Sequence, residues 1–103
     1  MTLEEFMPIA KKFGLIKIES DFIVEFYIDT HKYKTCFSGL VCTYYKKENI
    51  MSNPHMKVIT RNGEFDLMYG SSANLRSDVI FNKTKFVERA LTEMFKLIEK
   101  YKR

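Results

Sequence analysis

MKVITRNGEFDLMY, residues 56–69, alternates apolar and polar side chains on both sides of Asn62-Gly63. Alternation with a period of two is typical of β-strands, and Asn-Gly is a preferred pair for a two-residue type I′ hairpin turn. We therefore predict a hairpin in which Arg61 faces Glu64. One face of this hairpin is largely apolar and the other polar, which indicates an antiparallel sheet with one buried face.

Further strand patterns precede the hairpin. FIVEFYI, residues 22–28, directs four apolar side chains to one face: Phe22, Val24, Phe26 and Ile28. A longer pattern covers residues 33–45, with an interruption at Ser38-Gly39, where an interior glycine indicates a bulge or bend. Residues 15–18 begin an extended stretch, and residues 46–55 are predicted to form a loop.

Helices are predicted at both ends of the chain. Thr2 and Glu5 have the spacing of a capping box, and apolar residues follow at helical spacing. The N-terminal helix is therefore expected at about residues 2–13, with Pro8 kinking it or loosening its first turn. A broad apolar stripe predicts a long C-terminal helix at about residues 84–102.

These patterns predict a single α+β domain over residues 1–103. It has an N-terminal helix, a four- to five-stranded antiparallel sheet and a long C-terminal helix packed on the sheet. Both faces of the strand at residues 33–45 carry apolar side chains. Either one terminal helix covers each face, or a partner covers one of them.

We expect a cytoplasmic protein, because the sequence has neither a membrane span nor a secretory signal. No apolar run approaches the ~18 residues that a membrane span needs, so no membrane association is expected. The first residues lack the basic and apolar regions of a secretory signal. Cys36 and Cys42 would lie roughly 20 Å apart on one strand, so they are expected to be buried thiols without a disulfide.

The net charge of +4 comes from the end of the chain, because residues 83–103 carry seven basic and three acidic residues. This excess, together with two clusters that mix Tyr and Lys, is a pattern compatible with nucleic-acid binding. The first cluster is Lys32-Tyr33-Lys34 and the second is Tyr44-Tyr45-Lys46-Lys47. A basic helix face is most often simply a solvated face with ion pairs, and this is the preferred interpretation of the helix.

The stretch YGSSANLRSD, residues 69–78, could bind an anion through Ser71, Ser72 and Arg76. It lacks the second glycine and the lysine of a nucleotide-binding loop, so a connecting loop is the preferred interpretation. The chain's histidines and cysteines do not have zinc-site spacing. Neither a metal nor a cofactor is therefore expected, and an enzyme with its site at residues 70–78 is the third choice.

The composition favours Phe, Tyr and Met over Gly and Pro, which indicates an A/T-rich gene of the kind found in phages and mobile elements. The function expected first is that of a small non-enzymatic binding protein, a phage or mobile-element modulator that inhibits host nucleic-acid machinery. Its partner would be a protein or a protein–nucleic acid complex, and a homodimer is a further option. The alternative is direct binding of DNA or RNA by the C-terminal helix and the Tyr/Lys clusters. The residues expected to contact a partner are Lys32, Tyr33, Lys34, Tyr44, Tyr45, Lys46, Lys47, Arg76, Arg89, Lys96 and Lys100.

Overall fold

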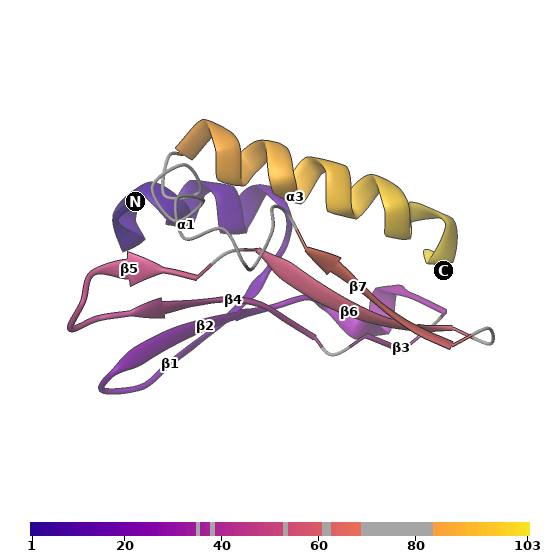
Figure 1. Ribbon diagram of the computed structural model, residues 1–103, viewed down its shortest axis with the longest axis horizontal. Coiled ribbons are helices and arrows are strands. Elements are labelled where there is room, and N and C mark those ends of the chain that lie inside the picture. Colours follow the sequence, from indigo (N-terminus) through magenta and orange to yellow (C-terminus); the bar gives the residue numbers. More distant parts are fainter. Residues whose placement is uncertain (35, 38, 53, 61–62, 69–83) are drawn as a thin grey trace.

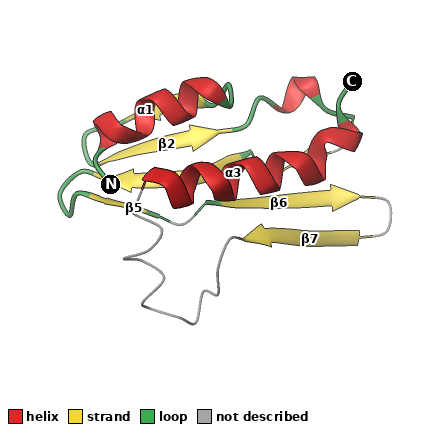
Figure 2. Cartoon of the chain, turned by 90° about the horizontal axis from the view of Figure 1, so that it is seen from above, coloured by secondary structure: helices red, strands yellow, loops and turns green. Residues whose placement is uncertain are grey.

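The computed structural model describes residues 1–34, 36–37, 39–52, 54–60, 63–68 and 84–103. Two helices lie together on one side of a layer of strands (Figure 1; Figure 2). The elements, in chain order, are α1 (Leu3–Lys12), β1 (Ile16–Glu19), β2 (Ile23–Tyr27), η1 (Thr30–Lys32), β3 (Cys36–Phe37), β4 (Leu40–Tyr45), β5 (Ile50–Met51), β6 (His55–Thr60), β7 (Gly63–Met68), α3 (Thr84–Ile98) and η2 (Glu99–Tyr101). The predicted α+β class is confirmed, with an N-terminal helix, a four-stranded antiparallel sheet and a C-terminal helix.

The strands form two antiparallel sheets rather than one, in the orders β1-β2-β4-β5 and β3-β6-β7. The pairing of β3 with β6 nevertheless continues the register in which β4 pairs with β5. Tyr44 pairs with Met51, and Phe37, seven residues earlier, pairs with Val58, seven residues later. The long strand predicted at residues 33–45 is thus split at Gly39, whose φ of +86° is a left-handed conformation that glycine adopts without strain.

The hairpin at residues 56–69 is confirmed as β6 and β7, but its predicted register is wrong. Glu64 pairs with Ile59, and Gly63 with Thr60, so the pairing is shifted by two residues from the one that places Arg61 opposite Glu64. Strand β6 also pairs with β3 on its other edge, so more than the turn sequence determines its register. The turn residues 61–62 lie outside the described residues.

The loop predicted at residues 46–55 is too long. It contains β5, which forms a hairpin with β4 through a turn over residues 46–49. Asn49 has a positive φ of 56°, a conformation that asparagine tolerates better than most residues, and the Tyr44 hydroxyl donates to its side-chain oxygen.

Helix α1 begins as its sequence predicts. The Glu5 amide donates to the Thr2 hydroxyl oxygen at 3.1 Å, and the Thr2 amide donates to the Glu5 carboxylate at 3.4 Å, which completes the capping box. Pro8 lies inside the helix, where it has no amide proton to donate to the preceding turn.

The core lies between the helices and the four-stranded sheet. Phe6 of α1 and Phe26 of β2 are fully buried, and their rings meet edge to face with centroids 4.6 Å apart. Phe13, the C-cap residue of α1, contacts Phe95 of α3, with ring centroids 5.1 Å apart. The core around Phe6 and Phe26 contains further buried apolar residues, among them Ile9, Val24, Val41, Cys42, Tyr44, Met51, Val87, Leu91, Met94 and Ile98.

Candidate binding surfaces

The four-stranded sheet has a second face, which points away from the helices. Residues paired across antiparallel strands share a face, and successive residues of one strand alternate between faces. Val24, Phe26 and Met51 are buried on the helix side. The residues of opposite alternation on β1, β2, β4 and β5 form what we call the outer face: Ile16, Ile18, Ile23, Glu25, Tyr27, Thr43, Tyr45 and Ile50.

Four apolar residues of the outer face are exposed, whereas Thr43 on β4 is buried. The exposed fractions are 46% for Ile16, 53% for Ile18, 43% for Tyr45 and 47% for Ile50. The half-buried Ile23 connects them, because it pairs directly with Tyr45 and lies diagonal to Ile18. Single exposed apolar residues are ordinary on protein surfaces, whereas a contiguous group across four strands is typical of an interaction site.

One polar pair lies within this apolar surface. The Tyr27 hydroxyl donates to the Glu25 carboxylate at 2.9 Å, and this hydrogen bond is the main reason that the pKa of Tyr27 is raised above its ordinary value. The pair gives the outer face a fixed carboxylate among isoleucines. Such isolated polar groups orient a partner on a surface that is otherwise apolar.

A second surface forms where η1 meets the C-terminus. The Lys34 amide donates to the Tyr101 carbonyl at 2.6 Å, and the Arg103 amide donates to the Lys32 carbonyl at 2.9 Å. The Arg103 Nε also donates to the Tyr33 carbonyl at 2.9 Å. These bonds join segments about 70 residues apart. We call the basic residues of the two joined segments the basic cluster: Lys32, Lys34, Lys100, Lys102 and Arg103.

The basic cluster has little acidic compensation among the contacts of the described residues. Glu99 approaches Lys102 only to 3.9 Å, and both side chains are more than half exposed, so this ion pair is weak. Asp29 accepts a hydrogen bond from the His31 amide, at the start of η1. Exposed cations gathered in this way attract anions, and phosphate is the most common anion of macromolecules.

The structure divides the residues predicted to contact a partner. Lys32, Lys34 and Lys100 come together in the basic cluster, whereas the others that lie outside the core are dispersed. Tyr45, Lys46 and Lys47 lie at the β4–β5 hairpin, away from the C-terminal end of the molecule (Figure 1). Arg89 and Lys96 are exposed on α3, and Arg76 lies outside the described residues.

The interpretation of Tyr33 and Tyr44 as stacking surfaces needs correction. Their exposed fractions are 6% and 7%, so both rings belong to the core, and burial is the main reason that the pKa of Tyr33 is raised. Tyr33 follows η1 and forms an isolated bridge with Lys102, and Tyr44 lies on β4, where residues 41–44 are all buried. Of the tyrosines in the two clusters, Tyr45 alone is exposed.

Cys42 is a buried thiol whose pKa burial raises well above its ordinary value, so it stays protonated at neutral pH. Within the described ranges, no group of three His, Cys, Asp or Glu side chains is arranged to hold a metal ion. The loop at residues 70–78, for which anion binding is the less favoured interpretation, lies outside the described residues.

Comparisons with known proteins found no match: no family model, no curated protein and no solved structure is similar to this chain. None of the helices that the structure describes has the length and apolar character needed to cross a membrane.

Two parts of the outer face were missed in the sequence. Ile16 and Ile18 alternate with Lys17 and Glu19, and this period of two was a usable signal. Ile50 lies in a two-residue strand, which is too short for any period to appear. Its position on the face follows only from its pairing with Tyr45.

Proposed function

We propose that this protein is a non-enzymatic inhibitor that docks on a protein–nucleic acid complex, with its outer face bound to the protein component. The observation that carries the proposal is the exposure of Ile16, Ile18, Tyr45 and Ile50 on one sheet face. The A/T-rich coding bias supports a phage or mobile-element origin, and hence nucleic-acid machinery of a host as the target.

The outer face fits a protein partner better than a nucleic acid. Its members are isoleucine, tyrosine, one threonine and one glutamate, and it contributes no cation that could neutralise a phosphate. Complete burial of an isoleucine contributes about 1.5–3 kcal/mol, so each half-exposed one gains roughly half of that when a partner covers it. Several such side chains, with a hydrogen-bonding group at Glu25, resemble the centre of a protein–protein interface.

A variant that changes only the outer face can test this proposal. In Tyr45→Glu/Ile50→Lys the new charges are opposite each other across β4 and β5, so the hairpin keeps a favourable pair while the apolar surface is lost. The matched control is Glu93→Lys/Lys96→Glu, on exposed positions of α3. Both variants keep the net charge at +4.

Affinity capture from cells of the native host, quantified by mass spectrometry, is the assay. The wild type and the α3 control should retain the same protein, and the outer-face variant should lose it. Retention of the same proteins by all three chains would contradict the proposal. So would a wild-type chain that captures no protein.

The basic cluster supports a second candidate function, direct binding of DNA or RNA. Lys34→Glu, within the cluster, should weaken binding of a labelled duplex or single strand much more than Lys47→Glu, at the β4–β5 hairpin. Each variant reduces the net charge by the same amount, so the comparison separates a local site from a general charge effect. Affinity should also fall steeply with salt concentration. No binding at low salt, or equal losses in the two variants, would refute this function.

A further inference from the structure

Strand β1 is an edge of the four-stranded sheet, and it is exposed along its whole length. Among the described strands it pairs only with β2, and all four of its residues, Ile16–Glu19, are exposed. The opposite edge, β5, has only two residues. An exposed edge strand presents backbone amides and carbonyls that a further strand can bind.

The hairpin between β1 and β2 determines which backbone groups are available. The Ser20 amide donates to the Ile23 carbonyl, so these two residues form a hydrogen-bonded pair. Hydrogen-bonded pairs recur at every second residue of an antiparallel ladder. Ile18 and Ile16 therefore bond to β2, whereas the amides and carbonyls of Lys17 and Glu19 point away from the sheet.

A second copy of β1 fits this edge in one register. In a symmetric pair of β1 strands, the residues with outward backbone groups, Lys17 and Glu19, must lie opposite residues of the same kind in the second copy. The two-fold axis must therefore pass through a residue, because an axis between two residues would place Lys17 opposite Ile18. An axis at Lys17 places two lysines opposite each other, and an axis at Glu19 places two glutamates. An axis at Ile18 pairs Lys17 with Glu19 of the second copy, twice, and places the two Ile18 side chains together on the outer face.

We infer that the protein forms a homodimer in which two β1 strands pair antiparallel about Ile18. Four N–H···O bonds and two cross-strand Lys–Glu pairs hold the strands together. The two outer faces then join into one apolar surface that runs over both copies. The dimer is formed by this chain alone, so the dimer and the docking function proposed above can be tested independently of each other.

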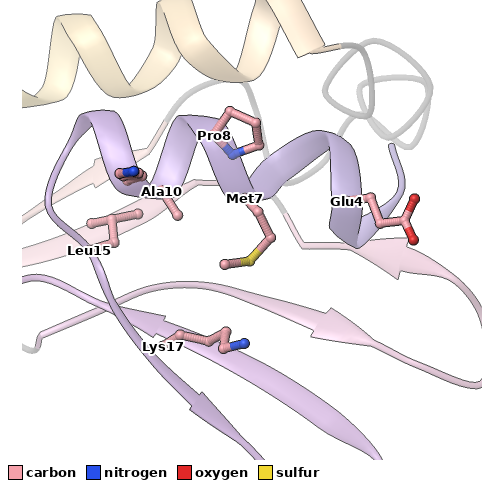
Figure 3. Close-up of a pocket in the computed structure, with 7 residues that line it drawn as sticks. Glu4, Met7, Pro8, Ala10, Leu15 and Lys17 are labelled. Carbon is pink, nitrogen blue, oxygen red and sulfur yellow. The ribbon is translucent and has the colours of Figure 1, made fainter.

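The second copy also covers a groove beside β1. The groove has a volume of about 650 Å³ and lies between α1 and the chain leading into β1. Figure 3 shows Met7 and Pro8 of α1, with Leu15 and Lys17 beneath the helix. Met7 and Leu15 are only partly buried by the core, so a copy seated on β1 removes further apolar surface from water. This burial adds to the pairing of two short strands.

Charge reversal tests the register. The wild type should show twice the mass of 12.2 kDa in sedimentation over a concentration series. Lys17→Glu places carboxylates opposite each other across the two strands, and Glu19→Lys places lysines opposite each other. Each variant alone should therefore dimerise roughly tenfold more weakly or worse. An equimolar mixture of the two variants restores both opposite-charge pairs, and it should contain heterodimers.

Glu19 also binds Lys46 of its own chain at 2.7 Å, and Glu19→Lys removes this contact. Recovery in the mixture distinguishes the loss of the dimer from local damage. Lys47→Glu, which reverses a lysine charge in the same way at an exposed position outside β1, on the turn between β4 and β5, is the control and should remain dimeric. Circular dichroism would verify that each variant is folded.

Hydrogen exchange gives an independent measure of the register. The amide of Ile18 should be protected at all concentrations, and those of Lys17 and Glu19 only where the dimer forms. A wild type that is monomeric at every concentration would overturn the inference. It would also be overturned if both single variants stayed dimeric, or if their mixture stayed monomeric.

Discussion

Phe6→Ala should be among the most destabilising substitutions in this chain, because it removes a buried aromatic contact between α1 and the sheet. Phe6 is fully buried, and its ring meets that of the fully buried Phe26. Truncating a buried phenylalanine to alanine lowers the free energy of unfolding by about 3–5 kcal/mol. A small domain has a total of about 5–15 kcal/mol, so the variant would be near the limit of folding.

Phe22→Ala is the matched control, since it deletes the same atoms at a side chain that is 77% exposed. Less than a quarter of its surface is buried, so the same deletion should cost about 1 kcal/mol or less. Urea denaturation followed by circular dichroism measures both. With a slope of about 1.5 kcal/mol per molar, Phe6→Ala should lower the midpoint by roughly 2–3 M, and Phe22→Ala by less than about 1 M.

A double-mutant cycle isolates the aromatic pair from simple burial. Phe6→Leu and Phe26→Leu keep the positions apolar but remove the edge-to-face contact. Their effects should fall short of additivity by about 0.5–1.5 kcal/mol. Equal losses for Phe6→Ala and Phe22→Ala would refute the reasoning, because burial against the sheet would then not determine stability at these positions.

Three further substitutions test local features. Thr2→Ala removes the capping hydroxyl of α1 and should lower the free energy of unfolding by about 1 kcal/mol in a urea titration, whereas Thr2→Ser should be close to neutral; equal losses would contradict the capping role. Gly39→Ala should lower it by about 1–2 kcal/mol, because φ is +86° and the added Cβ would lie 3.4 Å from the Tyr27 ring; a neutral result would contradict the observed backbone. In a Cys36→Ser variant, burial and a raised pKa should keep Cys42 unreactive with a thiol reagent at neutral pH until the chain is unfolded; rapid labelling of the native protein would show that the thiol is accessible.

The local elements could be predicted wherever the sequence pattern was long and had one cause. The capping box at Thr2 and the alternation over residues 22–28 identified α1 and the buried side of β2, but Phe22, at the start of that pattern, lies outside β2 and is 77% exposed. Gly39 marked the break in the long strand. The predicted register of the β6–β7 hairpin was wrong. Strand β6 pairs with strands on both of its edges, so the Asn-Gly turn was not the only determinant of its register.

The binding surfaces depend on contacts between distant parts of the chain. A backbone hydrogen bond joins Arg103 at the chain end to Lys32 of η1. A contact between residues so far apart in the sequence leaves no local sequence pattern from which it could be predicted. Tyr33 and Tyr44 share a pattern with exposed stacking residues, and only the packing of the helices shows that their rings are buried. Which sheet face stays open likewise depends on where both helices pack.

Site-specific photo-crosslinking in the native host tests the central claim most directly. A photoreactive phenylalanine analogue at position 45 would lie on the outer face, and the same analogue at position 93 would lie on the exposed side of α3. The docking function predicts a covalent adduct with a host protein from position 45 and none from position 93. An adduct from position 93 alone, or no adduct from either position, would contradict it.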